Sequence, residues 1–177
     1  MKALDLGFRL AACAALLATA AALAQRPVLP GAGPVPSAIV AARKIFVSNA
    51  GADSGLFPSP FSGYPDRPYN QFYAALKADG RYQLVADPAQ ADLVLELQLI
   101  APYGPTNGSK QYGASDPLPM FRLVVYDRPT HYILWTCTRS VELALLQKSH
   151  DRNFDDALTA IRLDFEGLAA TPPAPGN

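Results

Sequence analysis

Residues 92–100 read DLVLELQLI and show the clearest periodicity in the chain. Leucines at positions 93, 95, 97 and 99 alternate with Val94, Glu96 and Gln98. Successive side chains of a β-strand point to opposite faces of its sheet. The alternation therefore predicts a strand with one buried face and one half-solvated face.

Two segments downstream repeat this pattern. In MFRLVVY, residues 120–126, one face holds Phe121, Leu123 and Val125, and the other holds Met120, Arg122, Val124 and Tyr126. The turn DRPTH leads to YILWTCTRSVEL, residues 132–143, which is expected to point Ile133, Trp135, Cys137 and Val141 inward and Leu134, Thr136, Thr138 and Ser140 outward.

Shorter signals complete the order of elements. Residues 43–48 and 82–86 indicate two more strands, and residues 69–77 indicate a helix that stops at Gly80. A last helix over residues 153–168 has Asn153 as its expected N-cap. Its apolar anchors recur at helical spacing and are Phe154, Leu158, Ile161, Phe165 and Leu168. This order predicts an α+β fold, a two-layer α/β sandwich in which a mixed, mostly antiparallel sheet of about five strands carries two helices on one face.

The first 24 residues have the pattern of a secretory signal peptide. Lys2 and Arg9 precede an uncharged apolar run over residues 10–23, which ends in the small-x-small sequence of residues 22–24. The run is shorter than the roughly 20 apolar residues that span a bilayer. We expect cleavage near Ala24 and a periplasmic or secreted protein.

A cysteine at position 13 follows the sequence Leu-Ala-Ala, which is similar to a lipoprotein signal. Such signals place their apolar region before the cysteine, whereas here the apolar run comes after Cys13. We therefore expect no lipid anchor, and membrane association would require lipidation at Cys13.

The rest of the chain divides into three parts. Residues 25–38 hold four prolines and are expected to form a disordered spacer, residues 39–168 a single α/β domain, and residues 169–177 a disordered tail. The signal removes two of the 15 basic and one of the 15 acidic residues, which leaves a formal net charge of −1. This balance does not favour nucleic acid as a partner.

The half-solvated faces of the strands predict an open sheet face without a helix over it. Its side chains, placed by alternation, are Glu96, Gln98, Arg122, Tyr126, Thr136 and Thr138. Glu96 and Arg122 are candidates for a cross-strand ion pair. The face is either plain solvated surface or an interface for another chain.

Two long connections carry the remaining candidate residues. Residues 49–68 include LFPSPFSGYP, in which Phe57, Phe61 and Tyr64 lie among prolines, and residues 102–118 include Tyr103 and Tyr112. Loops of such length usually have a functional reason. The aromatic rings of residues 49–68 either fold back as a lid on the domain or present rigid apolar area to a partner. The two loops together are also candidates for framing a small-ligand site.

The central part of the sequence resembles bacterial envelope proteins. The segments FYAALKADGRYQLVADPAQADLVLELQL (residues 72–99) and FRLVVYDRPTHYILW (residues 121–135) carry the likeness, which covers residues 44–143. They resemble uncharacterised periplasmic families related in fold to the amino-terminal domain of the Tol-Pal protein TolB and to the periplasmic domain of the curli secretion lipoprotein. The resemblance implies a domain that assembles or bridges envelope complexes, with no catalytic residues to carry over.

The remaining polar residues include a few candidates for catalysis or metal binding. Ser54 follows Asp53 as in serine esterases of the Gly-Asp-Ser-Leu type, but Ala52 and Gly55 replace the flanking residues of that motif. A triad with His131 or His150 is therefore a remote alternative. Cys137 is expected to be a buried, inert thiol. His150, Asp151 and Asp155 lack a paired metal-ligand spacing and are read as a helix start.

These observations give a ranked set of functions. The first is an exported, non-enzymatic envelope domain that mediates protein–protein interaction or assembly, with an unknown envelope protein or a second copy as its partner. The second is a small-ligand-binding protein with its site between residues 49–68 and 102–118. The third is a serine hydrolase that uses Ser54. No cofactor or metal is expected in any of them.

Overall fold

The computed structural model describes residues 33–102 and 118–170. The chain divides into two compact units, Met1–Pro34 and Val35–Asn177, and the fold described here belongs to the second. The predicted signal peptide and most of the predicted spacer and tail lie outside the described residues.

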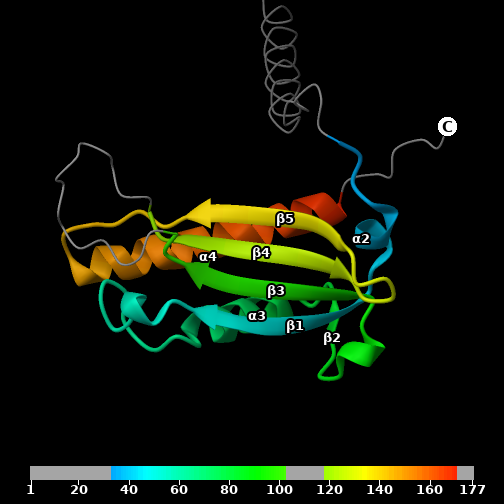
Figure 1. The fold of residues 1–177 in the computed structure, drawn as a ribbon, viewed down its shortest axis with the longest axis horizontal. Coiled ribbons are helices and arrows are strands. Elements are labelled where there is room, and N and C mark those ends of the chain that lie inside the picture. The colour runs from blue at the N-terminus through cyan, green and yellow to red at the C-terminus, as the bar shows by residue number, and fades with distance from the viewer. Residues whose placement is uncertain (1–32, 103–117, 171–177) are drawn as a thin grey trace, which may run out of the picture. The chain divides into compact units, whose positions relative to one another are not determined.

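Five strands and three α-helices occur in the described residues (Figure 1). In chain order they are α2 (Ser37–Ala41), β1 (Lys44–Ala52), α3 (Arg67–Asp79), β2 (Gln83–Leu84), β3 (Leu93–Ile100), β4 (Met120–Asp127), β5 (Ile133–Ser140) and α4 (Gln147–Ala169), with short 3-10 helices η2 (Ser54–Leu56) and η3 (Pro88–Gln90). None of the described helices is long and apolar enough to cross a membrane.

The strands form one mixed sheet in the order β2-β1-β3-β4-β5. Strand β1 runs parallel to β2 and β3, whereas β4 is antiparallel to both of its neighbours. Helices α3 and α4 lie behind the sheet in Figure 1, and no described helix lies over the opposite face. The predicted α+β sandwich is confirmed.

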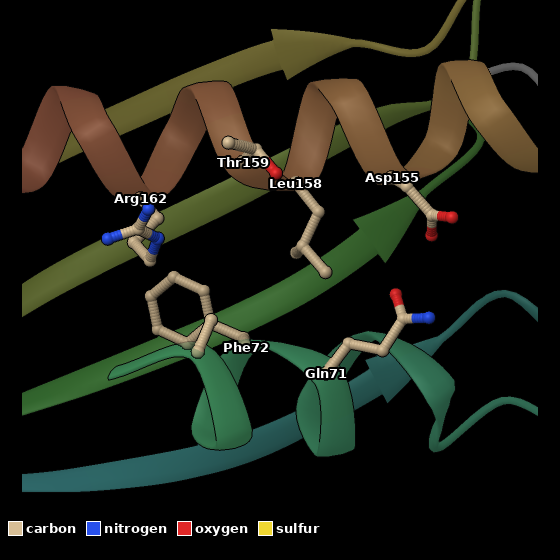
Figure 2. Close-up of a pocket in the computed structure, with 7 residues that line it drawn as sticks. Gln71, Phe72, Asp155, Leu158, Thr159 and Arg162 are labelled. Atoms are coloured by element: carbon tan, nitrogen blue, oxygen red, sulfur yellow. The ribbon is translucent and has the colours of Figure 1, made fainter. Parts of the chain in front are cut away.

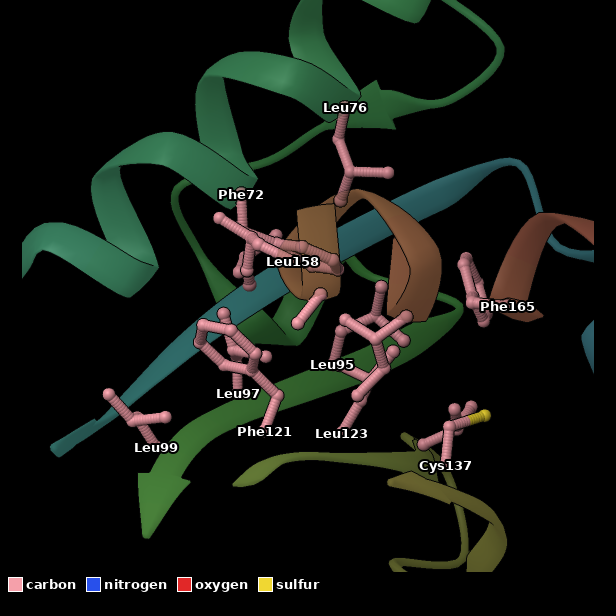
Figure 3. Close-up of a cluster of buried hydrophobic side chains, with 14 of the residues drawn as sticks. Phe72, Leu76, Leu95, Leu97, Leu99, Phe121, Leu123, Cys137, Leu158 and Phe165 are labelled. Carbon is pink, nitrogen blue, oxygen red and sulfur yellow. The ribbon is translucent and has the colours of Figure 1, made fainter. Parts of the chain in front are cut away.

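The core fills the space between the sheet and these two helices (Figure 3). All four leucines of β3 are buried, as the alternation predicts. Phe72 and Leu76 reach them from α3, while Phe154 and Phe165 reach them from α4. Full burial of each such side chain stabilises the fold by roughly 1.5–3 kcal/mol before entropy is counted.

Several boundaries of the elements differ from the predictions. Helix α2 begins inside the predicted spacer because Ile39 is fully buried in the core. Strand β1 continues to Ala52, which pairs with Leu99 beyond an irregularity at which Gly51 has a φ of +79°. The connection to α3 therefore begins at residue 53 and not at residue 49.

The start of α4 was predicted incorrectly. The helix begins at Gln147, so Asn153 lies in its interior and is not the N-cap. The amide of Asn153 donates to the backbone oxygen of Glu142 (2.9 Å), and the backbone N–H of Ala144 donates to Nδ1 of His150 (3.3 Å). These two bonds tie the first turns of the helix to the segment before it, while the N-cap position, Leu146, makes no side-chain cap hydrogen bond.

The inward position of Ile133 was also predicted incorrectly. A register irregularity between Val125 and Tyr126 places Ile133 opposite Tyr126, which lies on the open face. A shift of one residue moves a strand side chain to the other side of its sheet. Ile133 is accordingly 55 % exposed, while Leu134, predicted to point outward, packs partly against the core.

Candidate interaction surface

The uncovered face of the sheet begins with a cross-strand row of apolar and aromatic side chains. We call it the apolar row, and its members are Phe46, Val94, Tyr126 and Ile133. Each is partly exposed, and the neighbouring Tyr132 is 74 % exposed. Alternation placed Val94 and Tyr126 on this side of the sheet but pointed Ile133 inward, so this end of the face is more apolar than the sequence predicted.

The next two rows hold the charged residues of this face. Glu96 lies opposite Val124, and Arg122 lies opposite Gln98 one row further along. The predicted ion pair between Glu96 and Arg122 does not form. The hydroxyl of Tyr126 instead donates to Oε1 of Glu96 at 3.5 Å, the outer limit of a hydrogen bond. The Arg122 side chain is exposed and available to a partner.

Electrostatics on this face are mild. Partial burial of Tyr126 raises the pKa of its phenol, and the negative charge of Glu96 raises it further. Tyr126 is therefore neutral at physiological pH and acts as a hydrogen-bond donor. Val124, between Glu96 and Thr136 in the register, is 1 % exposed although no described helix covers it. Val124 therefore adds almost no exposed apolar area to the face.

The aromatic segment of residues 53–66 packs back onto the domain. Phe61 is fully buried, and its ring centroid lies 5.3 Å from that of Phe154 and 6.3 Å from that of His150. Phe57 is half-buried and also contacts Phe154. This is the packing of a lid, and Phe61 has no exposed area to offer a partner. Tyr64 differs, because it is 77 % exposed.

An arginine that sequence reasoning missed fastens this lid. Arg67, at the start of α3, places Nη1 2.6 Å from Asp151 and Nη2 2.8 Å from Asp155, both on α4. Its guanidinium also stacks over Phe154 at 4.1 Å from the ring centroid and donates to the backbone oxygen of Ser62 at 3.0 Å. One side chain thereby joins the lid, α3 and α4.

Asp151 is the anionic centre of this cluster. Burial would raise the pKa of its carboxyl, but hydrogen bonds from Arg67 and from the backbone and hydroxyl of Ser62 outweigh that effect and lower the pKa to about 2. Asp151 and Asp155, named as weak metal-ligand candidates, are thus both held by a guanidinium. The two carboxylates lie close together because they are four residues apart on one helix.

The two long connections leave the sheet at the same end, since β1 and β3 are parallel. Asp53 joins them at the base: its N–H donates to the oxygen of Leu99 (3.0 Å), and its carboxylate accepts from the N–H of Ala101. Tyr103 and Tyr112 lie outside the described residues. A ligand site between the loops cannot use Phe61, because that ring belongs to the core.

A crevice of about 200 Å³ lies between α3 and α4 (Figure 2). Its lining residues are Gln71, Phe72, Ala75, Asp155, Leu158, Thr159 and Arg162. Asp155 is paired with Arg67, and Arg162 is paired with Glu166. The crevice is smaller than the roughly 300–1,000 Å³ of typical ligand pockets. With its charges already paired, it is a weak candidate for a ligand.

The nucleophile candidates lie in settings that do not activate them. Ser54 begins η2 beyond the end of β1, whereas His131 follows the end of β4 at the opposite end of the sheet. The Ser54 hydroxyl makes no side-chain hydrogen bond within the described part of the chain. Burial raises the pKa of the Cys137 thiol to about 11, and Asp164 adds to the effect. The predicted burial of Cys137 is confirmed.

Comparisons with known proteins complete the picture of the fold. No protein-family model matches the sequence, and no curated protein matches it. Several solved structures are similar to this chain, and three bacterial examples follow. A DUF4136 family protein from Bacteroides thetaiotaomicron is 15% identical with a TM-score of 0.46, and the match covers 74% of this chain and 90% of that one.

Two further structures have lower TM-scores. A variant of the PelC dodecamer from Paraburkholderia phytofirmans is 15% identical with a TM-score of 0.43, covering 73% of this chain and 89% of that one. The LpoB C-terminal domain from Salmonella enterica is 13% identical with a TM-score of 0.36, covering 64% and 87%. At these identities and TM-scores the three structures assign neither a family nor a function to this chain.

Proposed function

We propose that this chain is an exported, non-enzymatic domain that docks onto another protein through the uncovered face of its sheet. The observation that carries the proposal is the apolar row, which crosses four strands in the absence of any described covering helix. Partly exposed aromatic and aliphatic side chains on the same face as an exposed arginine are typical of interface cores and rims.

The settings of the polar residues support a binding role over a catalytic one. Cys137 is buried and protonated, Ser54 lacks a hydrogen-bonded base, and Asp151 is held by Arg67. None of these groups has the activated environment that nucleophilic or acid–base chemistry requires. Export rests on the signal-peptide pattern of residues 1–24. Mass spectrometry of the protein from its native host is expected to find a chain that starts at Gln25. A chain that still carries residues 1–24 would contradict export with removal of a signal peptide.

A site-specific crosslinking experiment tests the docking face. A photoreactive phenylalanine analogue replaces Tyr126 on the open face, Tyr64 on the lid, or Leu163, which is exposed on α4. Irradiation in the native host is expected to give a discrete adduct from position 126 and none from position 163. An adduct from position 64 alone would move the docking site to the lid.

Alanine variants provide the second arm of the test. Replacement of Arg122 and Tyr126 removes side chains that protrude from the open face without touching the core. We expect partner recovery to be lost while the melting temperature stays nearly constant. Undiminished recovery of the partner by this double variant would overturn the proposal.

A further inference from the structure

We propose that the partner of the open face is a second copy of this chain, packed sheet against sheet around a two-fold axis that runs across the strands. This inference rests on the proposed docking function of that face. In such a dimer each strand lies over its own copy in the opposite direction, and rows at one end of the face meet rows at the other end.

The charges of the face are self-complementary in this arrangement. Glu96 and Arg122 lie on adjacent strands and one row apart, so the two-fold axis between their rows brings Glu96 of each copy toward Arg122 of the other. Measured in the plane of the sheets, Glu96 of one copy is offset from Arg122 of the other by one strand spacing, about 4.8 Å. Each of these residues is offset from the same residue of the other copy by two residues along the strand, about 6.8 Å. Attraction therefore exceeds repulsion, and neither residue is held in an ion pair within its own chain.

The apolar side chains of the face match as well. The row beyond Arg122 contains Ile100 and Met120, which are paired in the register and half-buried. The axis places the apolar row of one copy over this row of the other, with Tyr126 above Met120 and Val94 above Ile100. Apolar area would then meet apolar area at both ends, while the charged residues meet in the middle.

The area of the face is at the lower end of the range for a specific dimer. Four strands of about eight residues cover an area of roughly 500 Å² per copy, from spacings of about 4.8 Å between strands and 3.3 Å per residue. The pair would bury roughly 1,000 Å², the lower limit for a specific interface. We therefore expect a reversible dimer whose population rises with protein concentration.

Charge reversal gives a decisive test on the purified mature protein. Glu96→Arg and Arg122→Glu each create like charges across the interface and are expected to weaken dimerisation at least about tenfold in sedimentation velocity. Mixing the two variants restores opposite charges at both contacts, so a heterodimer is expected at concentrations where each variant alone is monomeric. Asp156→Arg and Arg152→Glu on exposed positions of α4 are matched controls and should dimerise like the wild type.

Crosslinking distinguishes self-association from docking onto a different protein. A photoreactive phenylalanine analogue at position 126 is expected to link to the peptide containing Met120 of a second copy. Circular dichroism shows whether the variants are folded. A folded wild type that stays monomeric at all concentrations, or mixed variants that fail to dimerise, would overturn self-association. An adduct between position 126 and a different protein would overturn it too, while leaving the proposed docking function standing.

Discussion

The two faces of the sheet are built from the same strands but carry different kinds of surface. On β3, the side chains of Leu95 and Leu97 lie in the core beneath α3 and α4, while the intervening Glu96 and Gln98 lie on the open face. The covered face is apolar in its centre, and its Arg139 on β5 pairs with Asp164 of α4. The open face is mixed, with an apolar row at one end and a charged middle. This difference separates residues that hold the fold from residues that are free to bind.

Neighbouring residues of β3 provide the largest contrast. Leu97→Ala opens a cavity in the core and is expected to lower the free energy of unfolding by about 2–5 kcal/mol. Gln98→Ala, one residue away on the open face, should change it by less than about 0.5 kcal/mol. Urea unfolding followed by fluorescence of Trp135 measures both. Equal losses would mean that the open face is covered in the native protein.

Two arginines extend the comparison to charged residues. Arg67→Ala removes both ion pairs to α4 and leaves Asp151 without its guanidinium, which is expected to cost about 2 kcal/mol of unfolding free energy. The same variant should be cleaved faster by proteases within residues 53–66, because the lid loses its fastening. Arg122→Ala on the open face serves as the control and should change neither property. A protease-resistant lid in Arg67→Ala would argue against the fastening role.

The pH dependence of stability follows from the carboxyl of Asp151. Its folded-state pKa, about 2, lies below the ordinary value of 3.8, so the unfolded state takes up protons first as the pH falls. The stabilisation is complete above about pH 4 and is lost as the pH falls from 4 to 2. We expect about 1 kcal/mol, since solvent near the pair weakens it. Asp151→Asn should flatten this part of the stability profile, and an unchanged slope would contradict the assignment.

The smallest expected effect belongs to the open face. Tyr126→Phe removes only the long hydrogen bond to Glu96 and should change the free energy of unfolding by less than about 0.5 kcal/mol. Spectrophotometric titration should show the loss of one phenol that ionises above the ordinary tyrosine pKa. A large loss of stability would place Tyr126 among the residues that hold the fold.

The covered face was predictable because its signals are local. Four alternating leucines in β3 and the helical spacing of Phe154, Leu158, Ile161 and Phe165 in α4 are all buried as expected. Periodicity shows which side of a helix or strand is buried, because that pattern depends only on the types of a few adjacent residues. The burial of Cys137 followed from the same reasoning.

The candidate site was less predictable. Alternation placed Glu96, Arg122 and Tyr126 on the open face, but it assigned Ile133 to the core because a bulge cannot be read from alternation alone. Glu96 pairs with Tyr126 and not with Arg122 because of the register between β3 and β4. That register cannot be derived from the alternation within each strand.

The sequence by itself therefore determined the class of fold, the buried faces of its helices and strands, and most of the side chains on the open face. Only the tertiary structure decided that Phe61 is core and that Arg67 reaches across 84 residues of sequence to Asp151. It also decided that Ile133 completes the apolar row. The physical reason is the range of the interactions: burial patterns repeat within a single element, whereas ring stacking, ion pairs and strand register depend on which distant elements the folded chain brings together.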